Sequence, residues 1–277
     1  MNEIILENGK KIGGTNSPFI IAEIGNNHNG DIEIAKKLIE IASQIGVDAV
    51  KFQVKDIGEA HPKELLDMLY TGPNSYGNTY REHKQALEFS QEELEEIYDY
   101  AKELDIICFS TPCNVNAVQR LEKLNNPIYK IASIFVTNLD LIEEICKTGK
   151  PVIMSTGCST VEEIDKAVNL IRSYHENLVL LHSTTSYPTN DEDINFNVIP
   201  TLENHYDCPI GYSGHEKGLG VTVSCIALGA CVIERHFTLD RTMKGPDHAS
   251  SIERDGMRLL VSRAKRLHIA LGLPDIR

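Results

Sequence analysis

The sequence predicts a closed (β/α)₈ barrel, and three observations carry this prediction. Eight short apolar runs alternate with helix-like segments along nearly the whole chain, which is typical of parallel strands joined by crossover helices. The length of 277 residues is close to the ~250 that such a barrel needs. No G-x-G-x-x-G turn follows the first run, which disfavours an open, doubly wound sheet.

The predicted elements begin with a hairpin and continue with the barrel strands. Residues 1–18 contain an Asn-Gly turn signal at Asn8 and Gly9, which predicts a small hairpin plugging one end of the barrel. The apolar runs then predict eight strands, at residues 19–25, 49–54, 106–112, 128–133, 151–157, 178–184, 209–215 and 231–238.

Helix signals lie between these runs. Asp31 is a predicted N-cap for a segment that repeats apolar residues every three or four positions and ends at Gly46. Ser90 precedes an acidic first turn, and residues 159–174 begin in the same way. A final amphipathic helix is predicted over residues 254–271, so the sequence predicts a single domain over residues 1–277.

The one long irregular stretch covers residues 56–86 and is rich in glycine, asparagine and tyrosine. Insertions between a strand and its helix are usually substrate-binding loops or lids, and a surface excursion without a role is the alternative.

Composition excludes several classes of function. A net charge of -13 and a pI near 5.2 argue against nucleic-acid or anionic-membrane binding, which needs a basic stripe. No run approaches the ~20 apolar residues of a membrane span, and the N-terminus lacks a signal-peptide core, so a soluble cytoplasmic protein is expected. Seven scattered cysteines without C-x-x-C spacing predict buried free thiols.

The last two predicted strands end on histidines, His215 and His236. Adjacent strands of a barrel bring their ends together, so the two imidazoles could share a divalent metal ion. Glu234 precedes His236 by two residues and is predicted to face the same cavity. A strand histidine on its own is more often a core or surface residue than a metal ligand, and it is the pairing that favours the metal site.

Two lysines, Lys51 and Lys130, lie inside apolar runs. Burying a lysine costs several kcal/mol unless an anion neutralises it, so both are expected to face an anion. Either one alone could instead point outward or act as a Schiff-base nucleophile. The polar residues at the ends of the runs, expected to share one face, are Glu23, Asn27, His28, Lys51, Gln53, Thr111, Lys130, Ser133, Ser155, Thr156, His182, Ser183, Thr185, Ser213, His215, Glu234 and His236.

The serines of this ring, Ser133, Ser155, Ser183 and Ser213, would complete a phosphate or carboxylate cradle around the lysines. A divalent ion beside a basic pocket fits metal-assisted attack on a carbonyl, with a phosphorylated or carboxylated co-substrate. A Schiff-base aldolase is the competing interpretation, although such an enzyme needs no metal.

Several segments together resemble a known family: FIIAEIGNNHNG, AVKFQ, NSYGNTYREHKQALEFS, YKIAS, STG, TTSYP, IGYSGHEKG and ERHFTLDRTMKGPDHASS. From about residue 15 to residue 271 the chain is similar to the sialic acid synthase family. That family comprises N-acetylneuraminate synthases, the 9-phosphate synthases and the related legionaminic acid, pseudaminic acid and spore-coat polysaccharide enzymes.

The resemblance implies condensation of phosphoenolpyruvate with an open-chain aldose, usually N-acetylmannosamine or a derivative, to a nine-carbon 2-keto acid and phosphate by C–O cleavage. It implies that Mn²⁺ or Mg²⁺ is held by His215 and His236, with Glu23 as the acid/base group. Residues implied to hold phosphoenolpyruvate are Lys51, Thr111, Lys130, Ser133, Ser155, Ser183 and Ser213. Those implied to face the sugar or the reacting water are Glu23, Gln53, Tyr187, Glu234 and Asp247.

The chain departs from the family pattern in two respects. Members usually carry a C-terminal antifreeze-like domain that reaches across a swapped dimer and offers an arginine to the sugar, and this sequence ends before it. Either the sugar is recognised differently or a separate chain supplies that domain; a homo-oligomer is expected, and a non-catalytic barrel subunit is a further alternative. Arg81 stands where relatives often have glycine, and Thr185, at the anion pocket, where some have asparagine.

Overall fold

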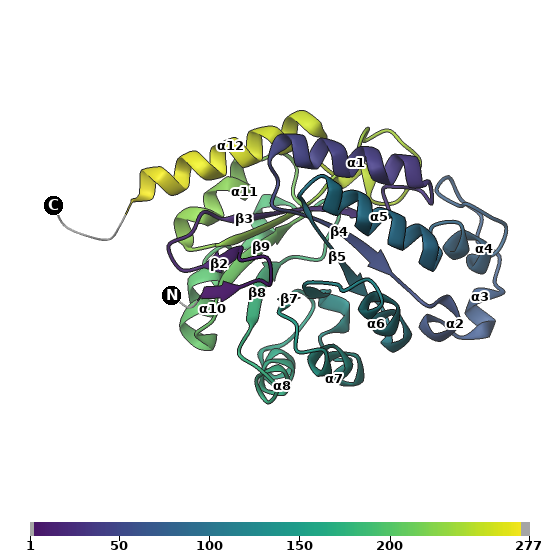
Figure 1. Ribbon diagram of the computed structural model, residues 1–277, viewed down its shortest axis with the longest axis horizontal. Coiled ribbons are helices and arrows are strands. Elements are labelled where there is room, and N and C mark those ends of the chain that lie inside the picture. Colours follow the sequence, from purple (N-terminus) through teal and green to yellow (C-terminus); the bar gives the residue numbers. More distant parts are fainter. Residues whose placement is uncertain (1–2, 273–277) are drawn as a thin grey trace.

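The computed structural model describes residues 3–272, and its centre is a closed barrel of eight parallel strands (Figure 1). The strands follow one another around the barrel in chain order, and the last pairs with the first. This confirms the predicted fold. The strands are β3 (Phe19–Gly25), β4 (Ala49–Val54), β5 (Ile107–Pro112), β6 (Tyr129–Ile131), β7 (Val152–Ser155), β8 (Leu178–Ser183), β9 (Ile210–Gly214) and β10 (Val232–His236).

Helices surround the barrel and follow its strands (Figure 1). They are α1 (Ile32–Ile45), α2 (Ile57–Ala60), α3 (Lys63–Leu66), α4 (Tyr80–Gln85), α5 (Gln91–Glu103), α6 (Val115–Glu122), α7 (Leu139–Lys147), α8 (Val161–Arg172), α9 (Asp191–Ile194), α10 (Val198–Tyr206), α11 (Gly220–Ser224) and α12 (Arg254–Leu271), with the short 3₁₀ helices η1 (Ser133–Phe135), η2 (Cys225–Leu228) and η3 (His248–Ser250).

The helix signals are confirmed where the sequence placed them. The Asp31 carboxylate accepts from the first backbone amides of α1, which ends at Gly46 in the left-handed conformation (φ 80°). Ser90 opens α5 with a capping box, whereas the corresponding cap of α8 is Thr160 rather than Ser159.

The barrel interior has two layers because side chains alternate along each strand. On β3, the inward positions are Phe19, Ile21 and then Glu23, so the layer nearer the amino ends is apolar and the layer above it is polar. The outward residues, such as Ile20 and Ala22, pack in the larger core cluster between the strands and the helices. This layering leaves one end of the barrel available for chemistry.

A two-stranded antiparallel hairpin covers the apolar end. Its strands are β1 (Glu3–Ile5) and β2 (Lys11–Gly13). Ile4, Leu6 and Ile12 are buried in one cluster with the apolar floor of the barrel. The predicted plug is therefore confirmed; Met1 and Asn2, and residues 273–277 at the other end of the predicted domain, lie outside the described residues.

The expectation of an irregular stretch over residues 56–86 is partly wrong, because α2, α3 and α4 all lie within it. Asp56 caps α2, and Thr79 with Glu82 forms a capping box at α4. The segment nonetheless contributes residues to the mouth of the barrel, as a lid would. Residues 56–86 are called the lid segment below.

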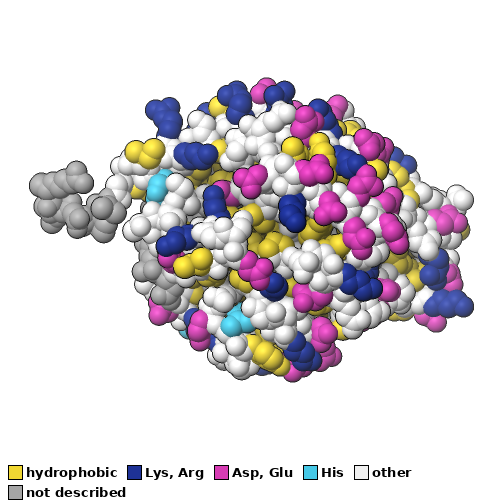
Figure 2. Space-filling view, in the orientation of Figure 1, with side chains coloured by type: hydrophobic (Ala, Val, Ile, Leu, Met, Phe, Trp, Pro, Cys, Tyr) yellow, Lys and Arg dark blue, Asp and Glu magenta, His cyan; other side chains and the backbone are white. Residues whose placement is uncertain are grey.

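The cysteines, the helices and the surface charge are also the subject of predictions from composition. All seven cysteines are free thiols, and Cys158 is exposed whereas Cys108, Cys146, Cys208 and Cys225 are buried. Across residues 3–272, no helix has the length and apolar character needed to cross a membrane. On the face shown in Figure 2, acidic side chains are interspersed with lysines and arginines.

Candidate active site

A cavity of about 410 Å³ opens at the carboxyl ends of the strands, inside the polar layer of the barrel. All the residues that the sequence predicted to bind substrate or metal or to take part in catalysis line it, except Asp247. They are Glu23, Lys51, Gln53, Thr111, Lys130, Ser133, Ser155, Ser183, Thr185, Tyr187, Ser213, His215, Glu234 and His236. Every strand of the barrel or the loop that follows it contributes to this set.

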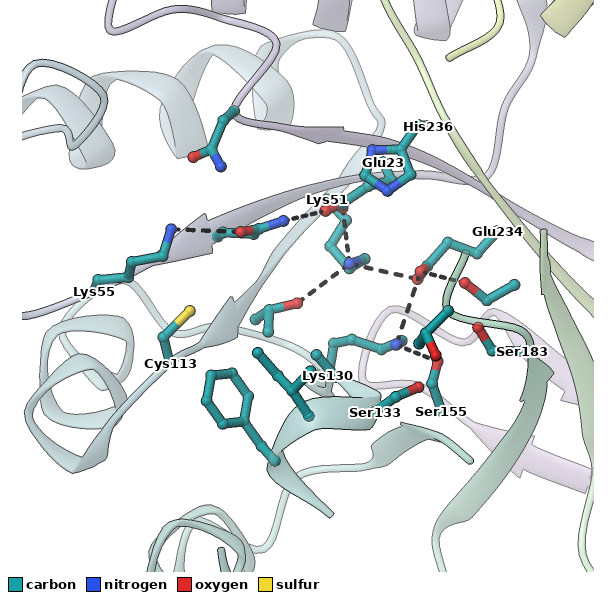
Figure 3. Close-up of a pocket in the computed structure, with 18 of the residues that line it drawn as sticks. Glu23, Lys51, Lys55, Cys113, Lys130, Ser133, Ser155, Ser183, Glu234 and His236 are labelled. Carbon is teal, nitrogen blue, oxygen red and sulfur yellow. Dashed lines mark hydrogen bonds and ion pairs between the residues drawn. The ribbon is translucent and has the colours of Figure 1, made fainter. Parts of the chain in front are cut away.

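Lys51 is at the centre of an ion network at the cavity floor (Figure 3). Its Nζ lies 2.8 Å from Oε2 of Glu23 and 3.5 Å from Oε2 of Glu234, and it donates to Oγ1 of Thr111 at 3.2 Å. Burial opposes the charge on this lysine, but the two carboxylates outweigh burial and raise its pKa. Lys51 is therefore a fixed cation.

Lys130 stands on the other side of Glu234 and is held less tightly. Its Nζ donates to Oγ of Ser155 at 2.6 Å and lies 3.8 Å from Oε1 of Glu234. Burial, together with the like charge of Lys51, lowers the pKa of Lys130 to about 8, although Glu234 opposes the shift. This ammonium group can lose its proton more easily than an ordinary lysine.

Glu234 lies between the two ammonium groups, as Figure 3 shows. Burial would raise the pKa of this carboxyl group, but Lys130 and Lys51 overcome burial and lower the pKa below its usual range. Ser213 donates to its Oε1 at 3.0 Å. On the far side of Lys51, Oε1 of Glu23 accepts from Nε2 of Gln53 at 3.1 Å. Both carboxylates are thus oriented by hydrogen bonds as well as by charge.

The serine hydroxyls predicted for the anion cradle lie around this network. Ser133 is the first residue of η1, directly after β6, while Ser155 and Ser183 end β7 and β8. Gly157 packs between them: a Cβ built on it would lie 2.8 Å from the carbonyl oxygen of Ser183 and 3.0 Å from Oγ of Ser133. Close approach of these loops therefore depends on the absence of a side chain at residue 157.

The two histidines predicted as metal ligands face each other across neighbouring strands, with ring centroids 5.5 Å apart. The ring of Tyr187 lies 4.0 Å from that of His215, centroid to centroid. Nδ1 of His215 is 2.9 Å from the carbonyl oxygen of Thr184, so this nitrogen carries the proton and Nε2 keeps a lone pair. Burial and the proximity of His236 lower the pKa of His215 to about 3, which keeps the ring neutral.

These two rings fit a divalent ion in their chemistry. Neutral His215 offers Nε2, and Nδ1 of His236 is buried without a hydrogen-bond partner in residues 3–272. Within the same residues there is no group of three or more histidine, cysteine, aspartate or glutamate side chains placed to hold a metal. The metal site consequently stays a prediction that depends on the two imidazoles.

Some polar residues at the strand ends do not reach the cavity, contrary to expectation. Asn27 donates to the carbonyl oxygen of Phe237 at 2.9 Å, and His28 stacks on Phe89. Thr156 and His182 bond to backbone carbonyl oxygens, at 3.2 Å and 2.5 Å respectively. All four satisfy local hydrogen bonds or packing instead of lining the site.

Asp247 is the one predicted substrate-binding residue outside the cavity lining. It is half-buried at the N-cap position of η3, where its side chain makes no capping hydrogen bond. Its carboxylate still lies near enough to add to the effect of burial, which raises the pKa of Tyr187. Asp247 therefore stands at the rim of the site, and its role stays a prediction.

The lining also includes residues that the sequence pattern did not indicate. They are Asn26, Lys55, Ala60, His61, Tyr80, Lys84, Cys113, Ala132, Ile134 and Phe135. Lys55 could have been found, because it continues the period-2 row of Lys51 and Gln53. The residues of the lid segment gave no such signal, because their placement depends on how that segment folds over the barrel.

Comparison with known proteins agrees with the fold and identifies the family. The NeuB family model matches residues 38–275. N-acetylneuraminate-9-phosphate synthase from Homo sapiens is 38% identical over 273 residues, which is 98% of this chain and 76% of that protein. N,N'-diacetyllegionaminic acid synthase from Campylobacter jejuni is 38% identical over 260 residues, which is 92% of this chain and 77% of that enzyme.

A solved structure of N-acetylneuraminic acid (sialic acid) synthetase from Leptospira borgpetersenii, in complex with citrate, superposes with a TM-score of 0.89 at 34% identity. The match covers 100% of this chain and 92% of that one. The family model covers most of the chain, the identities to curated relatives exceed one third, and the superposition extends over the whole barrel. This chain belongs to the NeuB family, the family of the sialic acid synthases.

Proposed function

We propose that this protein condenses phosphoenolpyruvate with an open-chain aldose related to N-acetylmannosamine, giving a 2-keto-3-deoxy sugar acid and phosphate. Carbon 3 of the enol attacks the aldehyde carbon and forms the new C–C bond, while the aldehyde oxygen takes up a proton. Water adds to carbon 2 and releases a proton, and the C–O bond to the phosphate then breaks. The reaction balances without an oxidant or a reductant.

The observation that carries this proposal is the charge of the cavity. Four lysines and only two carboxylates line it, in a chain whose net charge is -13. Two of the lysines are buried at its floor beside serine hydroxyls. A compact substrate with both a phosphate and a carboxylate group matches such a site, because each anionic group can accept charge-assisted hydrogen bonds from an ammonium group and a hydroxyl.

The inner residues have separate parts in this proposal. Lys51 and Lys130, with Ser133, Ser155 and Ser183, would bind the anionic groups of phosphoenolpyruvate and hold its carbon 3 toward the mouth. Their positions at the ends of rigid strands limit how far the bound enol can move. Thr111 would support this set through its hydrogen bond to Lys51.

Proton transfer is assigned to the two carboxylates. Glu234 stays ionised between the lysines and can accept the proton that the attacking water releases. Glu23, hydrogen-bonded to Gln53 and paired with Lys51, is the proposed acid/base group for the aldehyde oxygen. Tyr187, Thr185 and Gln53 would contact the sugar.

His215 and His236 would hold a divalent ion such as Mn²⁺ or Mg²⁺, which when bound polarises a carbonyl oxygen. The protein's own contribution is to keep His215 neutral and oriented through Thr184, and to leave Nδ1 of His236 without a competing partner in the described chain. The names of the relatives, which are synthases of sialic, legionaminic and pseudaminic acids, support the same reaction class.

The direct test is a condensation assay with phosphoenolpyruvate, MnCl₂ and a panel of aldoses, scored by release of phosphate and by mass spectrometry of the keto acid. We expect product only when an aldose and phosphoenolpyruvate are both present. Phosphate release without an aldose would contradict the proposal, because it would show hydrolysis of phosphoenolpyruvate instead of condensation. Inactivity with every aldose would favour a non-catalytic barrel subunit.

One observation favours a second candidate, a lysine-imine aldolase. Imine-forming lysines are partly neutral near pH 7, and Lys130, with its pKa of about 8, approaches this condition. Borohydride treatment in the presence of pyruvate separates the two candidates. A stable adduct on Lys130 or Lys51 would support the aldolase, whereas an unmodified protein is expected for the synthase.

A further inference from the structure

Two further lysines line the cavity, one directly before the lid segment and one within it. Lys55 follows β4 directly, and Lys84 lies on α4. Both line the cavity, as do His61 and Tyr80 of the same segment. None of these four residues belongs to the inner network of Lys51, Lys130, Glu23 and Glu234.

The outer lysines differ from the inner ones in their partners. Lys51 and Lys130 are both paired with carboxylates, whereas neither Lys55 nor Lys84 forms an ion pair with any residue between 3 and 272. Lys55 donates only a long hydrogen bond, 3.4 Å, to Oε1 of Gln53. Burial opposes its charge, and the more distant Glu88 and Asp247 contribute to raising its pKa, so the group stays protonated. The two outer ammonium groups thus have no direct carboxylate partner in the described part of the chain, although the Glu88 carboxylate accepts from the backbone amide of Lys55 at 2.8 Å.

Lys84 and His61 both lie against the ring of Tyr80. Nζ of Lys84 lies 5.0 Å from the centroid of the Tyr80 ring, and the His61 ring lies 5.2 Å from it, centroid to centroid. Burial lowers the pKa of His61, and the charges of Lys84 and then Lys55 lower it further. His61, Lys84 and Lys55 all line the same cavity. Three nitrogen groups therefore surround one region of the mouth.

The lid segment holds these groups in place through contacts with the loop before η3. Gly245 donates from its backbone amide to Oδ1 of Asn74 at 3.3 Å, and Tyr76 donates from its hydroxyl to the carbonyl oxygen of Lys244 at 2.5 Å. On the other side, Arg81 donates twice to Oδ1 of Asp67, at 3.2 Å and 2.9 Å. These contacts fix the residues that lead into α4 and its first turn, so Lys84 is presented from an ordered helix.

We propose that Lys55, Lys84 and His61 form a second anion subsite, and that it binds a phosphate monoester at the far end of the aldose. The proposal rests on the condensation described above. Lys51, Gln53 and Lys55 follow one side of the same extended chain, and four residues of strand span about 13 Å. An aldose with its aldehyde at the inner network and its terminal carbon toward the mouth would bring a terminal phosphate to these lysines.

A terminal phosphate suits this subsite better than a neutral hydroxymethyl group. A phosphate monoester has three acceptor oxygens and nearly two negative charges, so it can engage both ammonium groups at once. A neutral sugar would leave the two cations without a partner. The subsite would therefore select phosphorylated aldoses over their unphosphorylated forms.

The kinetic test compares N-acetylmannosamine 6-phosphate with N-acetylmannosamine for the wild type, Lys84→Gln and Lys55→Gln, with phosphoenolpyruvate and MnCl₂ present. We expect the wild type to prefer the phosphorylated sugar, and each variant to lose about ten-fold or more in kcat/KM for it through the KM of the sugar. The KM for phosphoenolpyruvate should change much less than the KM for the phosphorylated sugar, because Lys51 and Lys130 at the cavity floor remain in place in both variants. Lys63→Gln, an exposed lysine of the same segment, is the matched control and should match the wild type.

A binding experiment keeps the proposal separate from the condensation itself. Calorimetry with either sugar alone needs no turnover, so it reports on the subsite even if the condensation is not observed. Tighter binding of the 6-phosphate, lost in Lys84→Gln, supports the subsite. Equal binding of the two sugars, tighter binding of the corresponding 6-carboxylate, or a variant that changes only the KM for phosphoenolpyruvate would overturn it.

Discussion

Arg235 and Glu216 form a buried ion pair immediately behind the two cavity histidines. Nη1 of Arg235 lies 2.9 Å from Oε1 of Glu216, and its Nη2 donates to the carbonyl oxygen of Glu216 at 2.6 Å. Arg235 directly precedes His236, and Glu216 directly follows His215. Because neighbouring residues of a strand face opposite sides, the pair ties the two chain segments together on the outer wall while the imidazoles face the cavity.

This relationship predicts a large loss of stability when one partner is removed. Glu216→Ala leaves the Arg235 charge buried without its carboxylate, and we expect the free energy of unfolding to fall by about 3–5 kcal/mol. Urea unfolding followed by circular dichroism measures it. The exposed pair of Arg81 and Asp67 is the control, and Asp67→Ala should cost less than about 1 kcal/mol. Equal losses in the two variants would argue against the buried pair as a structural tie.

His215→Ala should weaken binding of Mn²⁺ to the protein without unfolding it, because one of the two proposed ligands is lost. Electron paramagnetic resonance of free Mn²⁺ during a titration measures the affinity independently of turnover. His205→Ala serves as the control, since His205 is exposed on α10 away from the cavity. Unchanged Mn²⁺ affinity in His215→Ala would show that the two imidazoles do not hold the ion.

The pKa of Lys130 predicts an alkaline limb in the pH profile. Above its pKa of about 8 the side chain becomes a neutral amine and no longer attracts an anion, so kcat/KM for phosphoenolpyruvate should fall as the pH rises through this value. Lys130→Arg stays protonated over this range and should lack the limb at whatever activity remains. A profile for the wild type that is flat from about pH 7 to pH 10 would be inconsistent with a lysine of lowered pKa in this position.

Gly157→Ala tests the packing of the serine cradle. The added Cβ would approach the Ser183 carbonyl oxygen to 2.8 Å and Ser133 Oγ to 3.0 Å, so both loops must move apart. We expect the KM for phosphoenolpyruvate to rise by about ten-fold to a hundred-fold, since small displacements of binding groups cost this much. Gly220→Ala is the control, because a Cβ there has nothing within 4 Å. Similar kinetics for both variants would mean that the cradle tolerates the displacement.

The barrel and the inner site could be predicted from the sequence because both follow from strand periodicity. Side chains alternate along a strand, so Glu23, Lys51 and Glu234 face inward on theirs. The parallel order of the strands brings their carboxyl ends together. Periodicity could not show that Asn27 and His182 would satisfy nearby carbonyl groups, because those partners come from other parts of the chain. For the same reason, strand periodicity could not predict that Lys84 lines the cavity, because its position depends on the fold of the lid segment.

The hairpin of β1 and β2 has a kinetic consequence. In residues 3–272, Ile4 and Ile12 close the barrel floor and the cavity opens at the opposite end, so molecules are expected to enter and leave there. Whatever binds deepest, beside Lys51 and Lys130, has to arrive before the molecule that rests above it and depart after that one has gone. A cavity with one opening therefore predicts ordered binding, with the enol phosphate first. Excess aldose should act as a substrate inhibitor, because aldose bound to the free enzyme would block access of the enol phosphate.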